Sequence, residues 1–159
     1  MIPELPESAR RVQEALDRSG LTFRVVEMPA STRTAKEAAA AIGCTVAQIA
    51  KSIVFRGAAS GKPILVVTSG VNRVNEKVVA ALAGEPLEKA AAEFVREETG
   101  YVIGGVPPLG FPGPITTWID EDLLQFAEVW AAAGTPFTVF SLDPRRLEEI
   151  TGGTVAGVA

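Results

Sequence analysis

The sequence contains no histidine. This absence excludes Ser-His-Asp and Cys-His catalytic groups, histidine zinc ligands and histidine general bases. A single cysteine, Cys44, excludes an internal disulfide framework and suits a reducing cytoplasm. Any catalysis by this chain must therefore use lysine, carboxylates, hydroxyl groups, backbone dipoles or the substrate itself, and we expect neither a metal nor another cofactor.

The sequence also lacks a long apolar run and an excess of positive charge. No stretch approaches the length of a membrane span, and the first residues lack the basic and apolar segments of a signal peptide. We therefore expect a cytoplasmic protein that contacts no membrane. The formal net charge of −4 argues against a protein that binds DNA or coats nucleic acid electrostatically. It does not exclude recognition of a nucleic acid end in a local pocket.

What the sequence does contain is typical of one globular α/β domain covering residues 1–159. Hydrophobic residues make up 47% and charged residues 21%, enough for a full core. Helical spacing and capping residues predict helices at 8–19, 34–43, 45–50, 75–84, 90–98 and 143–150. Strands are predicted at 22–28, 53–55, 63–68, 101–103, 115–119 and 137–140. Segment 124–131 fits either type, and the tail 152–159 is expected to be frayed.

The stretch 99–110 combines a short apolar run with two glycines and two prolines. We predict a buried strand at 101–103, which cannot continue because proline lacks a backbone donor. A stiff loop flanked by glycines can hold backbone N–H groups open toward a ligand. An ordinary turn explains the same residues, so the loop by itself leaves both interpretations open.

Lys51 and Asp120 are the charged residues of most interest. Lys51 stands at the junction of a predicted helix and strand, where it either keeps its ammonium group in solvent or provides a fixed cation at a pocket. Asp120 follows a predicted strand and is either a helix cap or a site carboxylate. The sequence alone leaves these alternatives open.

The order of these pieces resembles the YbaK/prolyl-tRNA synthetase-associated domain family, whose members deacylate misacylated tRNA. The resemblance covers residues 8–153, and it implies a curved, mixed, mainly antiparallel sheet flanked by helices. The motifs that carry it are Thr34-Ala-Lys-Glu-Ala-Ala39, Ile49-Ala-Lys-Ser-Ile-Val-Phe55, Asn72-Arg-Val-Asn75, Thr99-Gly-Tyr-Val-Ile-Gly-Gly-Val-Pro-Pro-Leu-Gly110 and Trp118-Ile-Asp120.

The resemblance also implies a site. Lys51 matches the family's essential lysine, and Gly104 to Pro108 matches a loop whose backbone lines the aminoacyl pocket. Catalytic roles fall on Lys51, Gly104 and Gly105. Substrate contacts are expected from Met28, Thr34, Val106, Pro107, Pro108, Leu109, Gly110, Asp120 and Ala132. Pro107 has no N–H, so we expect oxyanion donors among Gly105, Val106, Leu109 and Gly110.

Two departures from the family bear on specificity. Members active on cysteinyl-tRNA carry serine at the positions of Pro107 and Ala132, so that specificity is not carried over, and alanine is favoured. The expected partners are the acceptor end of an aminoacyl-tRNA and an aminoacyl-tRNA synthetase. The alternative function is a non-catalytic module that binds a tRNA end or a nucleotide, or docks on a synthetase.

Overall fold

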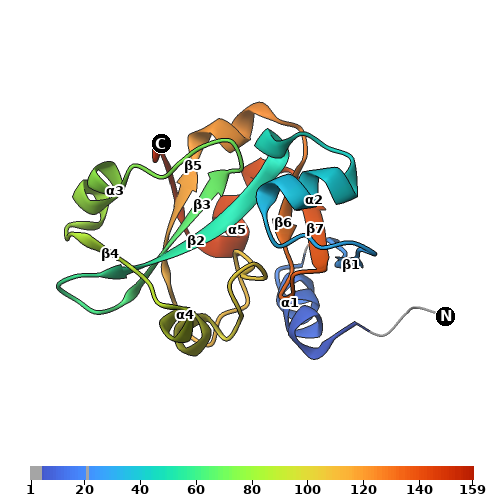
Figure 1. Cartoon of the computed structure of the whole chain (residues 1–159), viewed down its shortest axis with the longest axis horizontal. Coiled ribbons are helices and arrows are strands. Elements are labelled where there is room, and N and C mark those ends of the chain that lie inside the picture. The colour runs from blue at the N-terminus through green and yellow to red at the C-terminus, as the bar shows by residue number, and fades with distance from the viewer. Residues whose placement is uncertain (1–4, 21) are drawn as a thin grey trace.

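The computed structural model describes residues 5–20 and 22–159, whose strands form one eight-stranded sheet (Figure 1). The segment on which the signal-peptide expectation rests lies partly outside these residues. The strand order is β1-β7-β6-β2-β3-β5-β8, and β4 pairs with β2 beside this path. The pairs β2–β6, β3–β5 and β5–β8 are parallel, and the other pairs are antiparallel. This mixed sheet with its flanking helices confirms the predicted fold class.

Helices separate most of the strands along the chain, but β3 follows β2 and β7 follows β6 without a helix between them. The strands are β1 (Val26–Glu27), β2 (Ile49–Gly57), β3 (Pro63–Ser69), β4 (Leu87–Lys89), β5 (Thr116–Asp120), β6 (Val129–Ala132), β7 (Thr138–Leu142) and β8 (Thr154–Ala156). The α-helices are α1 (Glu7–Arg18), α2 (Ala35–Ile42), α3 (Glu76–Ala83), α4 (Ala92–Thr99) and α5 (Leu147–Thr151). Short 3-10 helices are η1 (Val46–Gln48), η2 (Glu121–Gln125) and η3 (Pro144–Arg146). None of the described helices has the length and hydropathy needed to cross a membrane.

Capping residues explain where two of these helices begin. The hydroxyl of Thr34 accepts the N–H of Glu37 at 3.1 Å, and α2 starts at the next residue. The side-chain oxygen of Asn75 accepts the N–H of Val78 at 3.3 Å in the same way for α3. Each cap satisfies an N–H that has no partner within the helix. Both predicted helix starts are confirmed.

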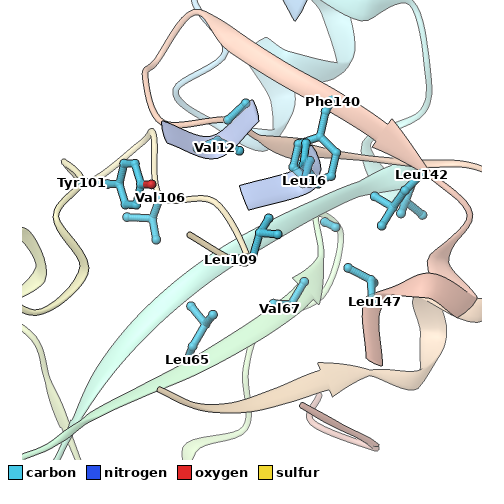
Figure 2. Packing of buried hydrophobic residues seen from close by; sticks show 14 of the residues in the cluster. Val12, Leu16, Leu65, Val67, Tyr101, Val106, Leu109, Phe140, Leu142 and Leu147 are labelled. Carbon is cyan, nitrogen blue, oxygen red and sulfur yellow. The ribbon is translucent and has the colours of Figure 1, made fainter. Parts of the chain in front are cut away.

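The largest hydrophobic core lies between α1, the loop that follows α4 and one face of the sheet. Figure 2 shows Leu16, Leu109 and Phe140 among the labelled side chains that meet there. Leu16 and Phe140 are fully buried. Each such side chain contributes roughly 1.5–3 kcal/mol through removal of apolar surface from water. The 101–109 segment is thus anchored from inside the molecule.

The predicted strand at 101–103 is wrong. Tyr101 is buried and its hydroxyl donates to the Gly110 carbonyl at 2.8 Å, but Val102 and Ile103 are 46% and 48% exposed. The N–H of Gly105 donates to the Val102 carbonyl at 3.0 Å, which closes a turn. The apolar run therefore curves back on itself, because no neighbouring strand pairs with it.

Strand β2 begins earlier than predicted. It starts at Ile49, and the predicted helix at 45–50 is reduced to the short η1. Lys51 therefore lies inside a strand and not at its junction with a helix. The strand predicted at 22–28 is also wrong in extent, because only Val26 and Glu27 pair with β7. The ambiguous segment 124–131 contains the end of η2 followed by β6.

The expectation of a frayed tail is wrong as well. Strand β8 pairs in parallel with β5, and Val158 is completely buried. The carbonyl of Val158 accepts the N–H of Asn75 at 2.7 Å, next to the start of α3. The half-buried side chains of Val155 and Ala156 also pack against the hydrophobic cores.

Candidate functional site

A cavity of about 320 Å³ lies where β2 separates from β6. The two strands pair only through Ile49↔Trp130 and Ala50↔Ala131, and beyond those residues they diverge. Figure 1 shows β2 between β6 and β7 on one side and β3 on the other. The lining comes from 49–53 of β2, from 32–35 with the following α2, from the 103–106 loop and from β6 and β7. The site is thus a gap in the plane of the sheet.

Lys51 lies at this gap and also lines an adjoining groove that contains Asn72 and Arg73. Burial lowers the pKa of Lys51, and the negative charge of Asp120 opposes this effect. Lys51 pairs across the ladder with Thr68 of β3. The hydroxyl of Thr68 donates to Asp120 at 2.8 Å. Lys51 therefore lies near the carboxylate of Asp120, which Thr68 of the neighbouring strand β3 holds in place.

Asp120 is buried at the end of β5 and accepts several hydrogen bonds. The donors are the hydroxyl of Thr68 at 2.8 Å, the N–H of Ser69 at 3.0 Å, the amide of Asn72 at 2.8 Å and the N–H of Asp122 at 2.9 Å. Burial alone raises the pKa of Asp120, but these donors outweigh it and lower the pKa below its ordinary value. The bond from Asp122 confirms Asp120 as the cap of η2, and its carboxylate does not line the cavity.

The glycine loop meets the cavity at Gly104. Gly104 has a φ of +90°, and a Cβ added there would lie 2.5 Å from Cγ of Arg33, whose side chain packs against it. A Cβ at Gly105 would lie 2.8 Å from the Thr135 backbone. The carbonyl of Gly105 accepts the N–H of Gly134 at 2.9 Å. Both glycines therefore permit a close approach between segments far apart in the sequence.

The rest of the loop points elsewhere. The N–H of Gly105 is already donated to Val102, which contradicts its predicted role as an open oxyanion donor. Leu109 belongs to the large core, and Gly110 lies against Tyr101 and α1. Neither these residues nor Pro107 and Pro108 line the cavity, which the loop reaches only through Ile103, Gly104 and Val106.

Comparison with known proteins identifies relatives of this chain with the same fold. A model of the aminoacyl-tRNA editing domain matches residues 29–150. The chain is 32% identical over 127 residues to the uncharacterised protein YwhH of Bacillus subtilis, covering 80% of each. It is 25% identical over 126 residues to EbsC of Enterococcus faecalis, a candidate Cys-tRNA(Pro)/Cys-tRNA(Cys) deacylase, covering 79% of this chain and 76% of EbsC. A crystal structure of a proposed trans-editing enzyme for prolyl-tRNA synthetase superposes with a TM-score of 0.91 at 51% identity, covering 98% of both chains.

The chain belongs to the aminoacyl-tRNA editing domain family. The YbaK-like resemblance inferred from its motifs is confirmed. Within this editing domain, Thr34 and Ala132 line the cavity. Met28 does not: its N–H donates to the Phe137 carbonyl at 2.7 Å, outside the cavity lining.

Two cavity residues of this editing domain were missed from the sequence. Arg33 packs its side-chain stem on Gly104 at the cavity, and Ser52 follows Lys51 in β2. Arg33 carries no signal beyond its position before the Thr34 cap. Ser52 could have been found only if the partners of β2 on each edge had been known.

Metal ligands do not gather at the cavity. Across residues 5–20 and 22–159, no three His, Cys, Asp or Glu side chains are grouped in a way that could hold a metal ion. The residues that line the cavity carry one ammonium, one guanidinium, three hydroxyls and one indole N–H as polar side-chain groups.

Proposed function

We propose that this chain hydrolyses the ester bond of misacylated tRNA, acting in trans to a synthetase. In this reaction a water oxygen adds to the ester carbonyl carbon, and the bond from that carbon to the ribose oxygen breaks. The ribose oxygen takes up a proton, and the amino acid leaves as a carboxylate with release of one further proton. An aminoacyl ester is already activated, so positioning and charge stabilisation suffice without histidine.

The observation that carries this proposal is the meeting of Lys51 with Gly104 across one cavity. The ammonium group of Lys51 can hold the terminal phosphate or the ester region of the tRNA end. The loop offers the backbone of Gly104 and Val106 at the cavity. The N–H of Gly105 and the side chain of Leu109 serve the fold instead. Membership in the editing family and the names of the relatives support the reaction type.

We propose alanine as the amino acid removed. The cavity wall is mostly aliphatic, from Ala38, Ile42, Ile49, Ala131, Ala132 and Val139. Two of the three hydroxyl groups at the cavity are already engaged, because Thr32 donates to the Pro136 carbonyl and Thr34 bonds Glu37. Such a wall accepts a methyl group and offers few partners to a polar side chain. The relatives named for proline tRNA support tRNA(Pro) as the carrier.

The test is a deacylation panel with tRNA(Pro) charged with alanine, serine, threonine or cysteine. We expect alanyl-tRNA to be hydrolysed fastest. Lys51→Ala should lower kcat/KM by at least about 100-fold, because it removes the cation that faces the reacting ester. Lys62→Ala, at the far end of the β2–β3 hairpin, is the matched control and should act like wild type. Wild-type deacylation by Lys51→Ala would contradict the assignment.

The second candidate is a non-catalytic module that binds a tRNA end. The observation that favours it is the occupied N–H of Gly105, which removes one expected oxyanion donor. Such a module would protect or ignore every ester in the panel, while still retaining alanyl-tRNA in a filter-binding assay. Hydrolysis of any one ester above the uncatalysed rate decides for the enzyme.

A further inference from the structure

Residues 51–54 of strand β2 have no ladder partner on the edge that faces the cavity. On this edge β6 pairs with Ile49 and Ala50, and β4 pairs from Phe55 onward. Ser52 lies between the two ladders and belongs to neither. Among residues 5–20 and 22–159, its N–H and its carbonyl have no hydrogen-bond partner.

The direction of the Ser52 N–H follows from the register of β2. The Ile49 carbonyl accepts the N–H of Gly70, and the N–H of Gly57 donates to Lys62. Odd-numbered residues of β2 therefore direct their backbone polar groups toward β3, and even-numbered residues direct theirs the opposite way.

The direction of the N–H of Ala58, the residue after β2, follows the same alternation. The N–H of Ala58 donates to the Pro86 carbonyl at 2.8 Å, on the β4 side. Ser52 is even-numbered, so its N–H points away from β3 and into the gap that forms the cavity. The side chain of Lys51 reaches the same cavity from one face of β2, and that of Ser52 leaves the other face.

The Ser52 hydroxyl is also without a partner. Its Oγ is buried and makes no hydrogen bond within the described part of the chain. The other hydroxyls at the cavity, on Thr32 and Thr34, are engaged. A buried polar group without a partner calls for a ligand or water that completes it. Ser52 thus combines two unpaired backbone groups and an unpaired hydroxyl beside Lys51.

We propose that the backbone N–H of Ser52 is an oxyanion donor of this site. The inference rests on the proposed ester hydrolysis and names a contact that the glycine loop does not provide. When water adds to the ester carbonyl, the carbonyl oxygen becomes an alkoxide and accepts the Ser52 N–H. When the bond to the ribose oxygen breaks, the carbonyl reforms and the contact weakens. A donor fixed in a strand needs no rearrangement during the reaction.

The test replaces single backbone amides by esters, which removes one N–H and keeps the side chain. The ester at Ser52 should lower kcat on alanyl-tRNA by about 10²-fold, with little change in Tm, because no strand uses this N–H. The ester at Ala58 is the matched control. It removes an N–H of the same orientation that is bonded to Pro86, so it should lower Tm and leave kcat unchanged.

Each result of these measurements either supports or overturns the proposal. Wild-type kcat in the Ser52 ester overturns the proposal, and so does a marked fall in its Tm, since that N–H would then serve the fold. Ser52→Ala removes the hydroxyl and keeps the N–H; a 10²-fold loss of kcat in this variant together with wild-type kcat in the Ser52 ester would transfer the contact to the hydroxyl and overturn the proposal. If the wild-type protein hydrolyses no ester in the panel, the proposed function itself is contradicted. An active Ser52 ester would overturn only the assignment of the oxyanion donor.

Discussion

Replacement of Asp120 by asparagine should destabilise the protein without a change of shape at that position. The buried carboxylate of Asp120 accepts bonds from Thr68, Ser69, Asn72 and Asp122. The asparagine amide keeps one oxygen and turns an NH₂ group toward donors. At least one donor then loses its acceptor, and hydrogen bonds to a charged group contribute about 1.5–3 kcal/mol each. We expect the free energy of unfolding at pH 7 to fall by about 2–4 kcal/mol.

The stability difference between wild type and Asp120→Asn should depend on pH in a definite direction. The folded-state pKa of Asp120 is lowered, so its contribution to stability is complete above the unfolded pKa, about 3.9, and is lost as pH falls through the folded pKa. The difference in unfolding free energy between wild type and Asp120→Asn should thus be constant above about pH 5 and shrink below about pH 4.

The assay is urea unfolding followed by circular dichroism at several pH values. Asp122→Asn is the matched control, because exposed Asp122 also accepts the Asn72 amide, at 2.7 Å, and should unfold close to wild type. Equal stabilities of wild type and Asp120→Asn at pH 7, or a difference that persists unchanged to pH 3, would refute the reasoning.

Three further predictions concern the site and the tail. Removal of the Asp120 charge should lower the pKa of Lys51 further, so the alkaline limb of kcat/KM for Asp120→Asn should move to lower pH, and an unmoved limb would contradict this coupling. Ala132→Ser adds a hydroxyl to the cavity wall and should raise kcat/KM for seryl-tRNA relative to alanyl-tRNA by up to about tenfold, measured by competition of the two esters. Val158→Ala removes two buried methyl groups and should lower the unfolding free energy by roughly 2 kcal/mol in a urea titration, whereas a loose tail would give no change.

Local chemistry was the part of the structure that the sequence could predict. The caps at Thr34, Asn75 and Asp120 depend on residues within three positions, and each was confirmed. The β2–β3 hairpin also follows from two apolar runs around a short turn. Such interactions join residues that are close in the sequence, so the residue pattern alone identifies them.

Long-range pairing was the part that it could not predict. The run at 101–103 and the tail both carry β-prone residues, yet only the tail finds a strand, β5, at its side. The choice depends on which edges of the sheet remain free. The same limit hid Ser52, because its place between two ladders exists only once β4 and β6 have paired with β2.

The gap between β2 and β6 also sets the time at which the site forms. Its two walls pair through Ile49 and Trp130, which are 130 − 49 = 81 positions apart in the chain. Contacts of such large sequence separation close a long loop and form late in folding. A nascent chain that has emerged from the ribosome only as far as β5 already holds Lys51, Ser52 and the glycine loop, but it lacks one wall of the cavity. We therefore expect such a chain to be inert toward charged tRNA until its last quarter has been synthesised.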